Sequence, residues 1–181
     1  DHRDLHRLIR RQRQMCIRDR VFSSKVKYGG IFPFSDFYKF CYEWLTEETG
    51  LLISEDKYKE KLAGDSKDIE IEWTGLRDMT DYFRFEAKIK FVIRNMTKVE
   101  LTHGGKKIKM NKGDIEIGIK GTLIKDYKGK FERTAFQKFL RAIYEKMVIP
   151  ARVEQFEEKI IDDCNEFLSQ AKAYLDLEGK K

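Results

Sequence analysis

Two long segments of the chain alternate apolar and polar residues almost without exception. From Phe83 to Ile93 the odd-numbered positions are apolar, and from Ile115 to Leu123 they are three Ile, one Gly and one Leu. A period of two places every second side chain on one face of a strand, so both segments are predicted to be antiparallel strands with one face in the core. The alternation of Ile69, Ile71 and Trp73 with polar residues predicts a neighbouring strand.

Weaker patterns predict the rest of the sheet. Residues 21–28 read as a first strand ended by Gly29 and Gly30, and residues 51–63 as a strand with three Lys on one face. A separate small hairpin is expected around His103, followed by a turn at residues 111–114. Each long strand would span about 40 Å, so bending is expected, with Gly118 and Gly121 as candidate bend sites.

Three segments have helical spacing. The first is expected to begin with Ser35 as its N-cap and to stop at Gly50, and the second covers residues 136–147 and ends at Pro150. The third runs from about Ala151 to Leu175, where apolar residues recur every three or four positions. Its stripe consists of Val153, Phe156, Ile160, Cys164, Phe167, Ala171, Tyr174 and Leu175.

These elements predict an α+β fold. We expect an antiparallel curved sheet of about five or six strands, packed against the long C-terminal helix, with two further helices. The order of elements over residues 21–176 resembles the helix-grip layout of the START-like superfamily, whose bent sheet wraps a C-terminal helix and encloses an apolar cavity. The resemblance rests on layout alone, and no motif transfers a site residue. The extra helix at 132–148 departs from the family pattern.

The first 20 residues differ in composition from the rest. They hold seven Arg, no Lys and three Asp, so they supply +4 of the formal charge of +6 and leave +2 for the remainder. Residues 14–20 resemble a translated sequencing adapter, and residues 1–20 are therefore interpreted as a non-native tail. The alternative is a short basic amphipathic helix that binds nucleic acid or anionic lipid. Residues 21–178 are expected to form one domain.

Catalytic and metal-binding patterns are scarce. His103 is the only His outside the tail and is expected in a solvated turn, and the paired carboxylates Glu70/Glu72 and Asp162/Asp163 fall on predicted polar faces. Cys41 and Cys164 lie on apolar helix stripes without metal-ligand spacing, which favours a reducing, cytoplasmic setting. We expect no catalytic residue, metal or cofactor, and no apolar stretch is long enough to span a membrane.

The aromatic side chains of the predicted core carry the functional hypothesis. We expect a non-catalytic, soluble binding module for an apolar small molecule or lipid, held between the sheet and the last helix. The expected lining residues are Trp44, Trp73, Phe83, Phe85, Phe91 and Phe156. One alternative is a structural or protein-interaction domain with a solid core. A nucleic-acid-binding protein is a second alternative, which the net charge of +2 disfavours.

Overall fold

The computed structural model describes residues 18–103, 106–128, 135–147 and 149–178. In this part of the chain, five antiparallel strands form one open sheet in the order β1-β5-β4-β3-β2. The strands are β1 (Arg18–Phe32), β2 (Leu52–Ala63), β3 (Ser66–Asp78), β4 (Phe83–His103) and β5 (Lys106–Lys125). The helices are α2 (Phe34–Glu47), α3 (Ala135–Met147) and α4 (Ile149–Glu178). This arrangement confirms the predicted α+β class.

The two longest strands are longer than their alternation indicated. β4 and β5 pair from Phe83 and Lys125 out to His103 and Lys106, so the predicted separate hairpin is the continuation of both strands. The predicted turn at 111–114 is wrong for the same reason. The pattern breaks because the pairing shifts register between Arg94 and Thr97, where Asn95 has a φ of 53°. A bulge of this kind changes whether odd-numbered or even-numbered positions face the core. A strand predicted from strict alternation therefore ends at the bulge.

The first strand also extends beyond its predicted limits. β1 begins at Arg18 and continues through Gly29 and Gly30, which pair with Asp114 and Gly113 of β5. The glycines therefore do not end the strand, because the partner strand runs on beside them. Residues 1–17 lie outside the described residues, and the non-native origin of the tail stays a prediction.

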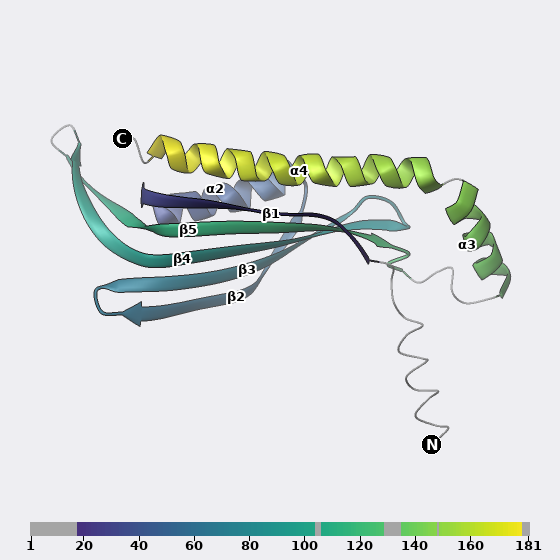
Figure 1. The fold of residues 1–181 in the computed structure, drawn as a ribbon, viewed down its shortest axis with the longest axis horizontal. Coiled ribbons are helices and arrows are strands. Elements are labelled where there is room, and N and C mark those ends of the chain that lie inside the picture. Colours follow the sequence, from purple (N-terminus) through teal and green to yellow (C-terminus); the bar gives the residue numbers. More distant parts are fainter. Residues whose placement is uncertain (1–17, 104–105, 129–134, 148, 179–181) are drawn as a thin grey trace, which may run out of the picture.

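The long C-terminal helix lies lengthwise across one face of the sheet, with α2 beside it (Figure 1). The predicted stripe of α4 faces the sheet: Ile160, Cys164, Phe167, Ala171 and Leu175 are buried, and Val153, Phe156 and Tyr174 pack against the same core. α2 buries Phe37, Cys41 and Leu45. Its N-cap is Pro33 and no side chain caps it, so the prediction of Ser35 as the cap is wrong.

Arg77 ties three elements together at one point. Its guanidinium, on β3, donates hydrogen bonds to the Thr49 carbonyl oxygen just after α2 and to Asp163 Oδ2 of α4, the latter at 2.9 Å. It also lies 5.4 Å from the centre of the Phe85 ring. Because the Arg77 and Asp163 side chains are largely shielded from water, this ion pair fixes the position of α4 along the sheet.

Candidate functional site

The six residues predicted to line a cavity all lie in the core or against it, and they are engaged in separate ring contacts. Trp73 and Phe91 meet edge to face at 4.9 Å between ring centres, and Phe83 lies 5.2 Å from Phe156 of α4. Two further contacts complete the set: Trp44 packs on Phe167, and Phe85 lies beneath Arg77. These aromatic side chains therefore contact other side chains of the protein, at several separate points along the sheet.

α4 packs closely on the sheet at Gly121. A Cβ atom at this position would lie 2.7 Å from Ile160 Cγ2 and 3.2 Å from Cys164 Sγ. Both are shorter than ordinary van der Waals contacts, so only a residue without a side chain fits here. The helix rests directly on β5 near the end of that strand, which gives this glycine a packing role, and the prediction that Gly121 is a bend site stays a prediction.

The opposite face of the sheet is covered by ion pairs. Lys90 Nζ lies 3.0 Å from Glu72, Lys57 Nζ lies 2.7 Å from Glu70, and Lys25 Nζ lies 3.1 Å from Glu116. The two carboxylates of β3 and the lysines of the neighbouring strands therefore form one exposed ion-pair network. Hydrogen bonds from Lys57 and Lys90 lower the pKa of Glu70 to about 2. A carboxyl of this kind stays ionised at neutral pH, so it is not poised to act as a general acid.

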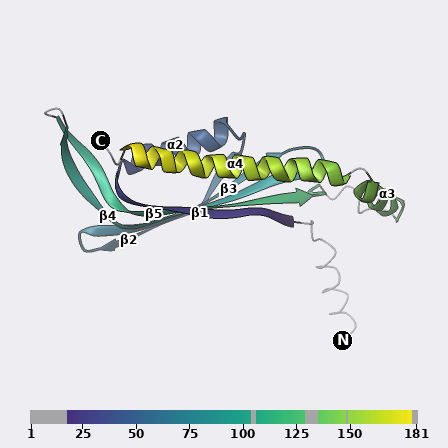
Figure 2. The same cartoon turned by 45° about the horizontal axis from the view of Figure 1, so that its top comes forward.

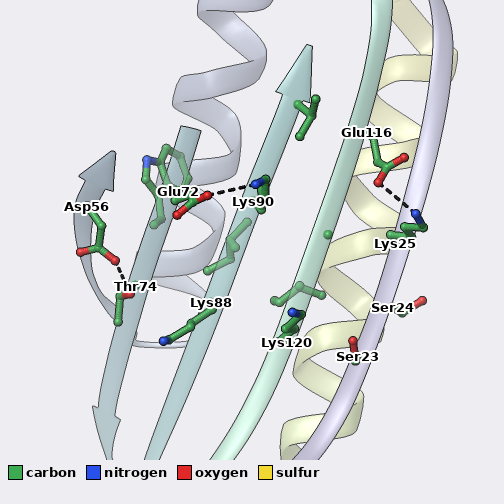
Figure 3. Close-up of a pocket in the computed structure, with 15 residues that line it drawn as sticks. Ser23, Ser24, Lys25, Asp56, Glu72, Thr74, Lys88, Lys90, Glu116 and Lys120 are labelled. Atoms are coloured by element: carbon green, nitrogen blue, oxygen red, sulfur yellow. Dashed lines mark hydrogen bonds and ion pairs between the residues drawn. The ribbon is translucent and has the colours of Figure 1, made fainter. Parts of the chain in front are cut away.

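A groove of about 620 Å³ opens on this outer face between β1, β5, β4 and β3 (Figure 3). Charged and hydroxyl side chains surround it, and Gly118 lies where a side chain would otherwise fill the space. Lys88 and Lys120 are neighbours across β4 and β5, and Ser23 of β1 is the next residue in the same row. This groove was not predicted, because the outward positions of the strands had been interpreted as a solvated surface.

Cys41 and Cys164 are buried free thiols. Burial raises the pKa of the Cys41 thiol well above its ordinary value and that of Cys164 to about 12, so both remain neutral thiols. Among the described side chains, no group of three His, Cys, Asp or Glu could hold a metal ion. The side chain of His103 lies outside what the structure describes. No helix in the described ranges is long and apolar enough to cross a membrane.

The most unusual surface belongs to α3. One stripe of this helix is apolar, and each of its members is between 41% and 78% exposed to solvent: Phe136, Phe139, Leu140, Ile143 and Met147. Large apolar residues on a monomeric protein are normally scattered singly, so five at helical spacing indicate a contact surface. We refer to these five residues as the α3 stripe.

The position of α3 explains why its stripe is uncovered. Pro150 lies near the start of α4, and a proline ring is incompatible with a helix that continues from α3, since it would clash with the carbonyl of Lys146. The chain therefore changes direction between the two helices, and α3 lies beyond the end of the sheet (Figures 1 and 2). The sequence had predicted the helix and its stripe, but not that the sheet ends before reaching it.

Charge is distributed unevenly between the two C-terminal helices. Residues 135–147, which form α3, contain three Lys or Arg and one Glu, a net charge of +2. Residues 149–178, which form α4, contain three Lys or Arg and eight Asp or Glu, a net charge of −5. The value of +2 for residues 21–181 conceals this separation, which is why the total charge gave no indication of an anionic partner.

No protein-family model, no curated protein and no solved structure matches this chain.

Proposed function

We propose that this protein is a non-catalytic lipid-binding module that docks on the surface of an anionic bilayer through the α3 stripe. The single observation that carries the proposal is the exposure of all five stripe residues on one amphipathic helix. Burying a Phe, Leu, Ile or Met side chain contributes about 1.5–3 kcal/mol, so an interface that covered the stripe would be favourable. A cavity for an apolar small molecule between sheet and α4 stays a prediction, and the ring contacts along α4 favour the exposed helix for lipid contact.

The charge of the surrounding sequence favours a lipid surface over an uncharged apolar partner. Helices that lie in the membrane interface combine a stripe of Phe and Leu with Lys and Arg, and α3 has this composition. Each Lys or Arg near an anionic leaflet adds about 1 kcal/mol. The acidic α4 would be repelled by the same surface. The opposite charges of the two helices therefore orient the domain with α3 toward the lipid and α4 away from it.

The edges of the sheet favour lipid contact over pairing with another sheet. β2 is an edge strand whose middle carries Lys57, Lys59 and Lys61 and whose pairing shifts register between Glu55 and Lys57. Lysines and bulges on an edge strand hinder the addition of a further strand. The edge strand β1 also has a register shift, between Arg20 and Phe22. Addition of a strand is thus disfavoured at both sheet edges, although β2 exposes three large apolar side chains of its own.

Vesicle sedimentation tests the proposal. The chain should bind vesicles of phosphatidylcholine with phosphatidylserine, and bind pure phosphatidylcholine vesicles less, with binding weakened by salt. Phe139→Glu removes about 2 kcal/mol of apolar burial, so it should lower the partition coefficient roughly 30-fold. Leu177→Glu is the matched control, because Leu177 is an exposed apolar residue at the other end of α4. Equal binding by both variants, or a stable dimer that Phe139→Glu disrupts without any vesicle binding, would contradict the proposal.

A further inference from the structure

The groove on the outer face of the sheet contains two like charges placed directly opposite each other. Lys88 of β4 and Lys120 of β5 are cross-strand partners, and Ser23 of β1 is the partner of Lys120 on its other side. Figure 3 labels all three among the residues that line the groove. Like charges in this position repel and destabilise a sheet, whereas an anion between them would turn the same arrangement into a favourable one.

The other two lysines of the groove have carboxylate partners that also line it. Lys90 is held by Glu72, and Lys25 by Glu116. In the described part of the chain, Lys120 makes no ion pair or hydrogen bond through its ammonium group.

Lys88 has one ion-pair partner in the described part of the chain, and that carboxylate is shared. Lys88 Nζ is 3.9 Å from Glu86 Oε1, and the other oxygen of Glu86 is 3.7 Å from Arg18. Lys88 thus shares one carboxylate with Arg18, and within the described part of the chain no carboxylate pairs with Lys120. The Thr74 hydroxyl, on the β3 side of the groove, donates a hydrogen bond to Asp56 of β2. This hydroxyl is therefore already occupied by a protein partner.

We propose that this groove binds the phosphate group of a small phosphorylated ligand between Lys88, Lys120 and Ser23. A phosphate monoester carries a charge of about −1.5 to −2 and has three strong acceptor oxygens, which matches two ammonium groups and one hydroxyl. A carboxylate would leave one of the two charges without a partner. The rest of the ligand would lie over Gly118, in a groove whose volume of about 620 Å³ falls in the usual range for small-molecule sites.

This inference is independent of the lipid surface, because the groove and the α3 stripe share no residue. The phosphate could belong to a soluble ester or to a lipid headgroup. Three probes distinguish these sources: inorganic phosphate, glycerol 1-phosphate, and vesicles that contain phosphatidic acid. Binding of glycerol 1-phosphate supports a soluble ligand, and Lys120-dependent binding of phosphatidic acid over phosphatidylserine vesicles supports a headgroup.

Amide chemical shifts measured during titration with inorganic phosphate test the shared chemistry. Saturable shifts are expected at the amides of Ser23, Lys88 and Lys120. Lys120→Gln should weaken phosphate binding about five- to tenfold, as expected for the loss of one exposed charge-assisted hydrogen bond. Lys59→Gln is the matched control, since Lys59 is an exposed lysine of the same sheet that does not line the groove. Equal weakening by both variants, or shifts spread over lysines throughout the sheet, would overturn the inference.

Thermal unfolding gives a second measurement that does not depend on ligand affinity alone. Without phosphate, Lys120→Gln should unfold at the same or a higher temperature than the unaltered chain, because the repulsion from Lys88 is gone. Phosphate should stabilise the unaltered chain and the Phe139→Glu variant, and leave Lys120→Gln nearly unchanged. A phosphate response lost in Phe139→Glu but kept in Lys120→Gln would refute the site in the groove.

Discussion

Substitution of Gly121 by Ala probes how closely α4 rests on the sheet. The added Cβ would lie 2.7 Å from Ile160 Cγ2, 3.2 Å from Cys164 Sγ and 3.4 Å from Phe22 Cβ. Ile160 is fully buried, and its β-branched side chain has little rotational freedom in a helix. The methyl group can therefore be accommodated only if α4 or β5 moves by several tenths of an ångström.

The size of the effect follows from two opposing contributions. Replacing Gly by Ala stabilises a protein by about 0.4–1 kcal/mol where the backbone is compatible, because the unfolded chain loses freedom. Overpacking a well-filled core costs about 1–3 kcal/mol. The net expectation for Gly121→Ala is a loss of roughly 0–2.6 kcal/mol, which lowers Tm by up to about 10 °C in a chain of this size.

Gly118 provides the matched control on the same strand. It lies three residues away on the outer face, and a Cβ there would be 3.8 Å from its nearest neighbour, Lys25 Cβ. The same Gly→Ala change should therefore be neutral or stabilising by about 0.5 kcal/mol. Urea unfolding followed by circular dichroism and tryptophan fluorescence measures both variants, and equal m-values would show that the unfolded states are comparable.

The opposite result would refute the packing argument. If a cavity separated α4 from β5 at this point, the extra methyl would contact open space and Gly121→Ala would be as stable as Gly118→Ala. A gain of up to about 0.8 kcal/mol from burying one more methyl group would then be expected. Such a gain would restore the hypothesis of an apolar ligand held between the sheet and the helix.

Two further predictions concern the charged groups. Asp163→Asn should destabilise the fold by about 1–3 kcal/mol in urea unfolding, because Arg77 loses its charged partner. Asp162→Asn, at an exposed neighbouring position, should change the free energy of unfolding little. Equal effects of the two substitutions would contradict the role of the Arg77 pair. Lys57 and Lys90 hold the Glu70 pKa at about 2, below its ordinary value of 4.5. A carboxyl whose pKa is lowered by folding stabilises the fold above its unfolded pKa, and this contribution disappears as the pH falls from 4.5 toward 2. Glu70→Gln should therefore show a flatter decline of stability in this pH range, and an unchanged decline would argue against the network.

The regular parts of this fold could be predicted from the sequence because each keeps a constant period. The alternation in β4 and β5 up to Ile93 and the α4 stripe from Val153 to Leu175 indicate which side chains face the core, and these faces are buried as expected. Prediction failed where two strands shift register together. The shift at Arg94 and Thr97 moves the apolar positions to the other face, and single-sequence periodicity cannot distinguish this from a turn.

The candidate surfaces depend on relationships between distant segments. The α3 stripe is visible in the sequence, but its exposure depends on where the sheet ends relative to Pro150. The opposition of Lys88 and Lys120 depends on the register of β4 against β5, which local sequence does not specify. Hydrophobic patterning thus predicted the core, whereas the surfaces proposed for lipid and phosphate required the three-dimensional arrangement.

Hydrogen exchange with and without anionic vesicles tests most directly whether α3 is the membrane-contacting element. Lipid contact should slow exchange of the amides in residues 135–147, leave the sheet and the middle of α4 unchanged, and have no effect in the Phe139→Glu variant. Protection centred on β2, on the outer groove or on α4, or no protection of α3 at lipid concentrations where the chain sediments with the vesicles, would contradict the proposed docking surface.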